Sequence, residues 1–93
     1  MRVLWTRPAL ADLDRIQDFI AADNPRAAYR LTQRLVDQAA RLSQTPMIGR
    51  PGRVVGTREL VASGTPYILV YRLRDRAEIL AVVHGARDWP RDF

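Results

Sequence analysis

The feature that most constrains this chain is a pair of apolar segments joined by a short charged connector. Tyr67–Leu73 and Ala77–Val83 are rich in aliphatic and aromatic residues, and Arg74–Arg76 separates them. Two such runs with so short a connection predict a β-hairpin. One face is expected to hold Tyr67, Leu69, Tyr71, Leu73, Ile79, Ala81 and Val83, and the other Ile68, Val70, Arg72, Leu80, Val82 and His84. Because both sets are mostly apolar, we expect the hairpin to be buried on both sides.

Composition limits the class of protein. The 93 residues are expected to form one domain, residues 1–93, which can bury a core without a disulfide or metal staple. The sequence has no cysteine, which excludes a disulfide framework and a thiolate metal site, and no cofactor is expected. The apolar runs are too short to span a membrane, and the first residues lack the apolar core of a signal peptide. We therefore expect a cytoplasmic protein without membrane contact.

The chain carries an excess of positive charge. Its net charge is +5, and all 15 basic residues are arginine. Such an excess indicates an acidic partner, either nucleic acid or an acidic protein segment. A host whose composition favours arginine accounts equally well for the missing lysine, but it does not account for the excess charge.

Two helices are expected before the hairpin. Thr6 followed by Pro8 is typical of a helix start, and Asn24 followed by Pro25 is typical of a second one. The first helix carries an apolar stripe of Ala9, Leu13, Ile16 and Ile20, and the second carries Ala28, Leu31, Leu35, Ala39 and Leu42. The second helix is expected to end near Ser43. Because the connection between the helices is short, they should form an antiparallel hairpin.

The remaining segments complete the predicted order strand, helix, helix, strand, strand, strand. Val3–Trp5 and Thr57–Ala62 are short strand candidates, and residues 46–56, with two prolines and three glycines, are expected to be an irregular loop. The fold class is therefore α+β, with a helical hairpin packed on a mainly antiparallel sheet in two layers. Two helices cover one sheet face. The second face is covered either by loop 46–56 and the C-terminal tail or by another molecule, and the size of the apolar area favours another molecule.

Several segments in this order resemble the ParE branch of the RelE/ParE toxin superfamily. They are the Asp-Asn-Pro break at residues 23–25, Pro-Met-Ile-Gly-Arg-Pro-Gly at 46–52, Thr-Arg-Glu-Leu-Val at 57–61, Tyr-Ile-Leu-Val-Tyr-Arg at 67–72 and Ile-Leu-Ala-Val-Val-His-Gly-Ala-Arg-Asp-Trp at 79–89. The resemblance implies the toxin of a type II toxin–antitoxin module, with a role such as plasmid stabilisation. It also implies a hetero-oligomer with a cognate antitoxin, for which the basic surface suggests an acidic, amphipathic segment that folds on binding.

The superfamily divides by target, and the residues favour one branch. Members similar to ParE poison DNA gyrase, whereas members similar to RelE cleave mRNA on the ribosome. The RelE-like strand carries an arginine where this chain has Ile68, and the RelE-like site commonly ends in a tyrosine where this chain has Phe93. Arg87 does match a RelE-like arginine. We therefore expect a non-enzymatic inhibitor of DNA gyrase that acts by protein–protein contact.

Two alternatives stay open. The first is a ribosome-dependent mRNA endonuclease with a catalytic set of His84, Arg87, Arg72 and Arg58, since cleavage needs a base, an acid and cations for the phosphorane charge. In the structural interpretation His84 simply bonds to the loop that follows its strand. The second is an inactive family member that serves as an antitoxin-bound scaffold.

Candidate residues for binding the antitoxin or the target are basic and aromatic. They are Arg50, Arg53, Arg58, Tyr67, Tyr71, Arg72, Arg87 and Trp89. Two of them also have local interpretations. Arg72 is expected to face Glu78 across the hairpin as an ion pair, and Trp89 either anchors the tail on the domain or contacts a partner.

Overall fold

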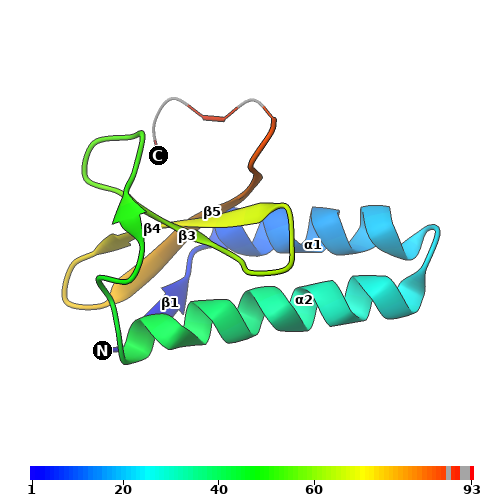
Figure 1. The fold of residues 1–93 in the computed structure, drawn as a ribbon, viewed down its shortest axis with the longest axis horizontal. Helices are drawn as coiled ribbons and strands as arrows, with labels where there is room; N and C mark the ends of the chain where they lie inside the picture. The colour runs from blue at the N-terminus through cyan, green and yellow to red at the C-terminus, as the bar shows by residue number, and fades with distance from the viewer. Residues whose placement is uncertain (88, 91–92) are drawn as a thin grey trace.

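The computed structural model describes residues 1–87, 89–90 and 93. Its elements are β1 (Val3–Trp5), α1 (Arg7–Ala21), α2 (Pro25–Ala40), a 3₁₀ turn η1 (Arg41–Ser43), β2 (Arg50–Pro51), β3 (Arg58–Val61), β4 (Tyr67–Leu73) and β5 (Ala77–His84). The strands form one sheet in the order β1-β5-β4-β3-β2, in which β1 runs parallel to β5 and the other pairs are antiparallel. Figure 1 shows α1 and α2 together on one side of this sheet. The predicted α+β fold class is therefore confirmed.

The helices begin where their capping residues predict. The Thr6 hydroxyl accepts the Ala9 N–H at 3.4 Å, and the Asn24 side chain accepts the Ala27 N–H at 3.1 Å. Thr6 also ties the end of β1 to the sheet, because its backbone N–H and its hydroxyl both donate to the Ile79 carbonyl. The predicted stripes face the sheet, and their buried members are Ala9, Leu13, Ala28, Leu35, Ala39 and Leu42. No helix in the described part of the chain is long and apolar enough to cross a membrane.

One segment has more regular structure than its sequence predicts. Residues 46–56 were expected to be irregular throughout, but Arg50 and Pro51 form β2, a two-residue edge strand against β3. Proline is tolerated there because an edge strand needs ladder hydrogen bonds on one side alone. The sheet consequently has one more strand than the sequence pattern indicates.

An irregularity in the hairpin changes which residues share a face. Val70 pairs with Ala81, but the next residue, Tyr71, pairs with Ile79, so that Leu80 is an extra residue in β5. Directly paired residues of antiparallel strands lie on the same face. From Ala81 onward the predicted faces are therefore reversed, and Val82 and His84, not Ala81 and Val83, lie on the helix side with Leu69 and Tyr67.

The second sheet face is closed within the chain, which contradicts the expectation that another molecule covers it. Its central side chains are almost fully buried, namely Ile68, Val70, Leu80 and Ala81, with exposed fractions of 6%, 1%, 8% and 5%. The loop between β2 and β3 lies on this side of the sheet (Figure 1). Val54 of that loop and Phe93 of the tail line the same hollow as Leu80. The expectation was wrong because sequence gives helix width but not the path of a loop.

Candidate functional site

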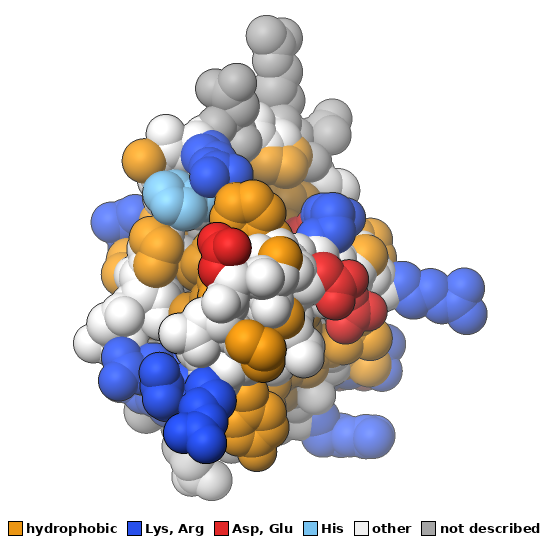
Figure 2. All heavy atoms as spheres, turned by 90° about the vertical axis from the view of Figure 1, so that its right-hand side faces the viewer, with side chains coloured by type: hydrophobic (Ala, Val, Ile, Leu, Met, Phe, Trp, Pro, Cys, Tyr) orange, Lys and Arg blue, Asp and Glu red, His pale blue; other side chains and the backbone are white. Residues whose placement is uncertain are grey.

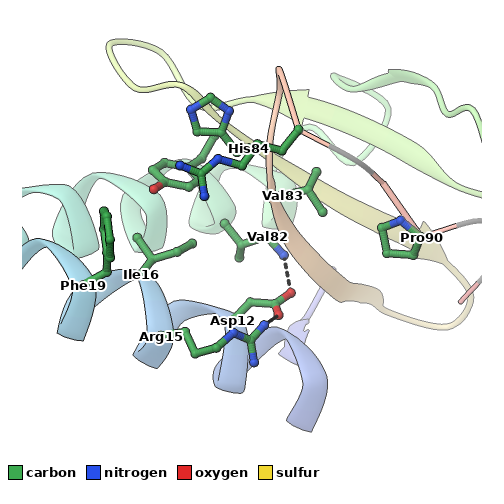
Figure 3. A pocket seen from close by; sticks show the side chains of 10 residues that line it. Asp12, Arg15, Ile16, Phe19, Val82, Val83, His84 and Pro90 are labelled. Atoms are coloured by element: carbon green, nitrogen blue, oxygen red, sulfur yellow. Dashed lines mark hydrogen bonds and ion pairs between the residues drawn. The ribbon is translucent and has the colours of Figure 1, made fainter.

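A groove with a volume of about 490 Å³ lies between α1 and the C-terminal half of β5. We call it the α1–β5 groove. Its lining residues combine apolar, acidic and basic side chains: Asp12, Arg15, Ile16, Phe19, Tyr67, Val82, Val83, His84, Arg87 and Pro90. Figure 3 shows α1 contributing one wall and β5 the other, with Pro90 beyond the strand. Phe19 is 73% exposed at this groove, although aromatic side chains are normally buried.

The groove exists because β1 is shorter than β5. The pairing of β1 with β5 ends at Trp5 and Ile79, so the following residues of β5 have no strand on that side. There the Asp12 carboxylate accepts the Val82 N–H at 3.0 Å, and its other oxygen pairs with Arg15 (Figure 3). A side chain of α1 thus satisfies a strand donor that would otherwise be open.

His84 lies at the end of β5 in this groove. Its Nδ1 accepts the Ala86 N–H at 3.1 Å, and its ring meets the Tyr67 ring edge-on at 5.5 Å between centroids. The first contact joins the histidine to the loop after its strand, as its structural interpretation predicts. Because Nδ1 is an acceptor, the neutral ring carries its proton on Nε2. Arg87 lies in the same groove and is exposed.

The second sheet face contains a buried carboxylate held by two of the candidate arginines. Glu59 on β3 is 3% exposed, and its Oε1 accepts from Arg50 Nε at 3.3 Å and Nη2 at 3.2 Å. Its Oε2 accepts the backbone N–H of Arg53 at 2.8 Å. The guanidinium of Arg53 lies 3.6 Å from the ring centre of Trp89, in a cation–π geometry. Arg53 thereby connects the loop to the tail, which supports the anchoring interpretation of Trp89.

A second buried carboxylate, Glu78, lies on β5 beside the turn of the β4–β5 hairpin. Arg72 faces Glu78 across the strands as predicted, with Arg72 Nε donating to Glu78 Oε1 at 2.5 Å. Arg74 and Arg76 approach the same carboxylate at 3.9 and 3.4 Å. The hydrogen bond from Arg72 and the nearby positive charges hold the pKa of Glu78 below its ordinary value of 4.5. Sequence predicts a surface pair here, but Glu78 is buried.

Two further candidates, Arg58 and Tyr71, form hydrogen bonds to the loop that precedes β2. The guanidinium of Arg58 donates to the carbonyls of Met47 and Gly49 at 3.1 and 2.6 Å. Tyr71 is fully buried, and its hydroxyl accepts the Gly49 N–H at 2.9 Å and donates to the Pro46 carbonyl at 2.7 Å. The interpretation of Tyr71 as a residue that contacts a partner is therefore wrong, because its side chain is inside the core.

The structure does not bring the four residues of the nuclease hypothesis together. His84 pairs with Tyr67 at one end of β4, whereas Arg72 is five residues further along, about 16 Å away at the usual strand rise. Arg58 is directed toward the loop before β2. Of the four, only His84 and Arg87 share the α1–β5 groove.

Sequence reasoning missed the residues that α1 contributes to the groove. Asp12, Arg15 and Phe19 lie off the apolar stripe of the helix and look like ordinary solvent-facing positions. Phe19 was the one usable signal, because a large aromatic residue beside the stripe is unusual on a solvated face. Among the described residues, no three His, Cys, Asp or Glu side chains form a group that would hold a metal ion.

Comparison with known proteins identifies the family. The model of the "ParE toxin of type II toxin-antitoxin system, parDE" matches residues 3–89. The chain belongs to the ParE toxin family. The predicted resemblance is therefore confirmed over nearly the whole chain.

Two curated relatives and one solved structure are similar to this ParE-family toxin over most of their length. A protein described as "Putative toxin Y4kP", from Sinorhizobium fredii, is 43% identical over 90 residues, which cover 97% of this chain and 94% of the relative. Toxin RelE2 of Caulobacter vibrioides is 39% identical over 87 residues, covering 92% and 97%. A solved structure of the chromosomal ParDE toxin–antitoxin system from P. aeruginosa matches with a TM-score of 0.82 at 33% identity, covering 90% of this chain and 95% of that one.

These similarities establish a toxin of the ParDE/RelE type and support an antitoxin as its partner. The support for an antitoxin therefore comes from the relatives and not from the predicted open sheet face, which is closed. The matched family is named for ParE and one matched relative for RelE, so the target has to be argued from the residues.

Proposed function

We propose that this ParE-family toxin inhibits DNA gyrase by protein–protein contact and is neutralised by a cognate acidic antitoxin in the cytoplasm. The observation that carries the proposal is the separation of the nuclease candidates. Arg72 is engaged with Glu78, and Arg58 is engaged with two backbone carbonyls. An endonuclease needs its base, acid and cations around one phosphate. The family model over residues 3–89 favours the same branch.

The α1–β5 groove is the surface that we assign to the antitoxin. It offers apolar contact through Ile16, Phe19 and Val83, and positive charge through Arg87. An acidic, amphipathic segment would satisfy both, with its apolar side in the groove and its carboxylates on the arginine. Beyond Ile79, β5 pairs with no strand on that side, so an extended segment could also lie along this edge.

Two exposed aromatic residues, one inside the groove and one outside it, allow a matched test. Phe19 on α1 is 73% exposed at the groove, and Tyr29 on α2 is 63% exposed away from it. Phe19→Ala should weaken antitoxin binding about tenfold or more, as expected for an aromatic interface anchor, and Tyr29→Ala should leave it unchanged. Isothermal titration with the cognate antitoxin measures both. Equal affinities for the two variants would remove the groove from the proposal.

The target is tested with the purified toxin in two parallel assays. One measures supercoiling of relaxed plasmid by gyrase and the accumulation of gyrase-linked DNA breaks. The other maps mRNA ends by primer extension in a reconstituted translation reaction. We expect inhibited supercoiling with intact mRNA, and His84→Ala should inhibit gyrase as well as the parent chain does. Topoisomerase I relaxation of the same plasmid serves as the control for a direct effect on DNA.

A second candidate function, ribosome-dependent mRNA cleavage, has one observation in its favour. The α1–β5 groove holds an imidazole, a carboxylate and two guanidinium groups, from His84, Asp12, Arg15 and Arg87. The carboxylate is engaged by Arg15 and the Val82 N–H, which leaves His84 as the available base. Cleavage within codons that disappears in a folded His84→Ala variant would establish this function and overturn the gyrase proposal.

A further inference from the structure

Among the described residues, some arginines of this toxin pair with carboxylates of the fold and others do not. Five of them surround the two buried glutamates on the second sheet face: Arg50, Arg53, Arg72, Arg74 and Arg76. By contrast, Arg26, Arg30 and Arg34 on α2 are exposed, and within residues 1–87, 89–90 and 93 none of them has a carboxylate within 4.0 Å. We call these three residues the α2 arginine row.

The spacing of the row places its charges on one side of the helix. Residues four apart are neighbours on a helix surface and are about 6 Å apart along its axis. Arg26 and Arg30 border a shallow hollow together with Pro25 and Tyr29. At the other end of the row, Arg34 Nη1 lies 3.5 Å from the Gly64 carbonyl, which directs this side chain across the β3–β4 turn. Figure 2 shows arginine side chains gathered low on the face at the tip of the helical hairpin.

Two further features strengthen the positive potential at this place. The row begins at the N-terminus of α2, which carries the positive end of the helix dipole. In addition, α2 contains one acidic residue, Asp37, at the far end of the row. Three arginines and a helix N-terminus thus act together on the same exposed surface.

The composition of the row distinguishes between the two kinds of acidic partner. An acidic, amphipathic protein segment needs several apolar anchors, and along the row Tyr29 is the one exposed aromatic side chain. Regularly spaced guanidinium forks instead match a row of phosphates. A straight helix-borne row reaches the phosphates beside the wide major groove of B-form DNA, whereas the A-form major groove is deep and narrow.

We propose that the α2 arginine row, with Tyr29, binds the phosphate backbone of duplex DNA. The contact is independent of sequence, because phosphates position a protein but carry no base information. Tyr29 donates a hydroxyl hydrogen bond to a phosphate from the same surface. This surface is separate from the α1–β5 groove and shares no lining residue with it. The inference therefore goes beyond the proposed function and does not depend on which target the toxin inhibits.

The test measures binding of the full-length toxin to a fluorescent 20-base-pair DNA duplex by anisotropy as a function of salt. Three phosphate contacts predict a slope of about −2.7 for log K against log salt concentration, and thus a loss of affinity of about 40-fold between 50 and 200 mM salt. The variant with Arg26→Gln, Arg30→Gln and Arg34→Gln should lose that slope almost completely. Each single substitution should reduce it by about 0.9.

A charge-matched control separates the row from net charge. Arg2, Arg7 and Arg41 are also exposed and have no carboxylate partner among the described residues. Replacing these three by glutamine removes the same charge and should change the slope by less than half as much as the row variant. An equal effect of the two triple variants would overturn the proposal, because binding would then follow total charge.

Two competitors complete the experiment. An RNA duplex of the same length should bind more weakly than DNA, and polyglutamate should not displace DNA at equal charge concentration. Preferential binding of RNA, or displacement by polyglutamate, would contradict a DNA backbone site. Urea unfolding of each variant verifies its fold, since exposed substitutions of this kind usually change stability little.

Discussion

Replacing Tyr71 by phenylalanine tests how the segment before β2 is attached to the sheet. The Tyr71 ring is fully buried, and its hydroxyl bonds to the Gly49 N–H and the Pro46 carbonyl. The substitution keeps the ring but leaves the buried Gly49 N–H without a partner, at a cost of about 1–3 kcal/mol. Pro46 is partly exposed, so we expect its carbonyl to bond to water instead. We therefore expect a loss of about 2 kcal/mol in the free energy of unfolding.

A loss of this size is easily measured. For a domain of this length it lowers the thermal midpoint by about 8–16 °C and the urea midpoint by about 1–2 M at an unchanged m-value. Hydrogen exchange of the Gly49 amide should accelerate more than that of the strands. Tyr29→Phe is the matched control, because Tyr29 is 63% exposed, and it should change stability by less than about 0.5 kcal/mol. A Tyr71→Phe variant as stable as this control would refute the reasoning.

Three further predictions concern single contacts. The pKa of folded Glu78 is lowered, so its ionised form stabilises the fold above its ordinary pKa of 4.5, and this contribution is lost as pH falls through the folded value. The stability difference between the parent chain and Glu78→Gln, measured with urea, should therefore be larger at pH 7 than at pH 3. Asp12→Ala should cost about 1–2 kcal/mol in urea unfolding by leaving the Val82 N–H unpaired, whereas Asp12→Asn keeps an oxygen acceptor and should cost less. Arg53→Ala should shift the indole N–H resonance of Trp89 in ¹H–¹⁵N spectra, since it removes the stacked guanidinium.

The helices and the turn end of the hairpin were predictable because their signals are local. Thr6 and Asn24 cap helices that begin at the next residue, and both apolar stripes face the sheet. Arg72 and Glu78 lie opposite each other because a three-residue connector fixes the register beside it. In each case the decisive residues are within a few positions of one another.

The reversed faces beyond Leu80 were not predictable from the pattern. A strand with alternating polar and apolar residues would reveal an extra residue, since its polar side chains would point into the core after the bulge. β5 is apolar from Ile79 to Val83, so either register buries apolar side chains and the sequence contains no contradiction. The α1–β5 groove was missed for a related reason. It depends on Asp12 meeting Val82, 70 positions away, at the point where β1 stops.

The closed second sheet face also changes what the antitoxin has to do. If that face were open, the antitoxin would complete the hydrophobic core, and its removal would leave an unstable toxin. Here Val70 and Ala81 are buried without a partner chain, and Arg53 fastens the loop to the tail. Under the proposed docking at the α1–β5 groove, antitoxin binding adds stability that grows with the logarithm of its concentration relative to Kd, but the fold does not require it. A toxin that acts after its antitoxin is lost needs this property, because the released chain must retain the surfaces with which it reaches its target.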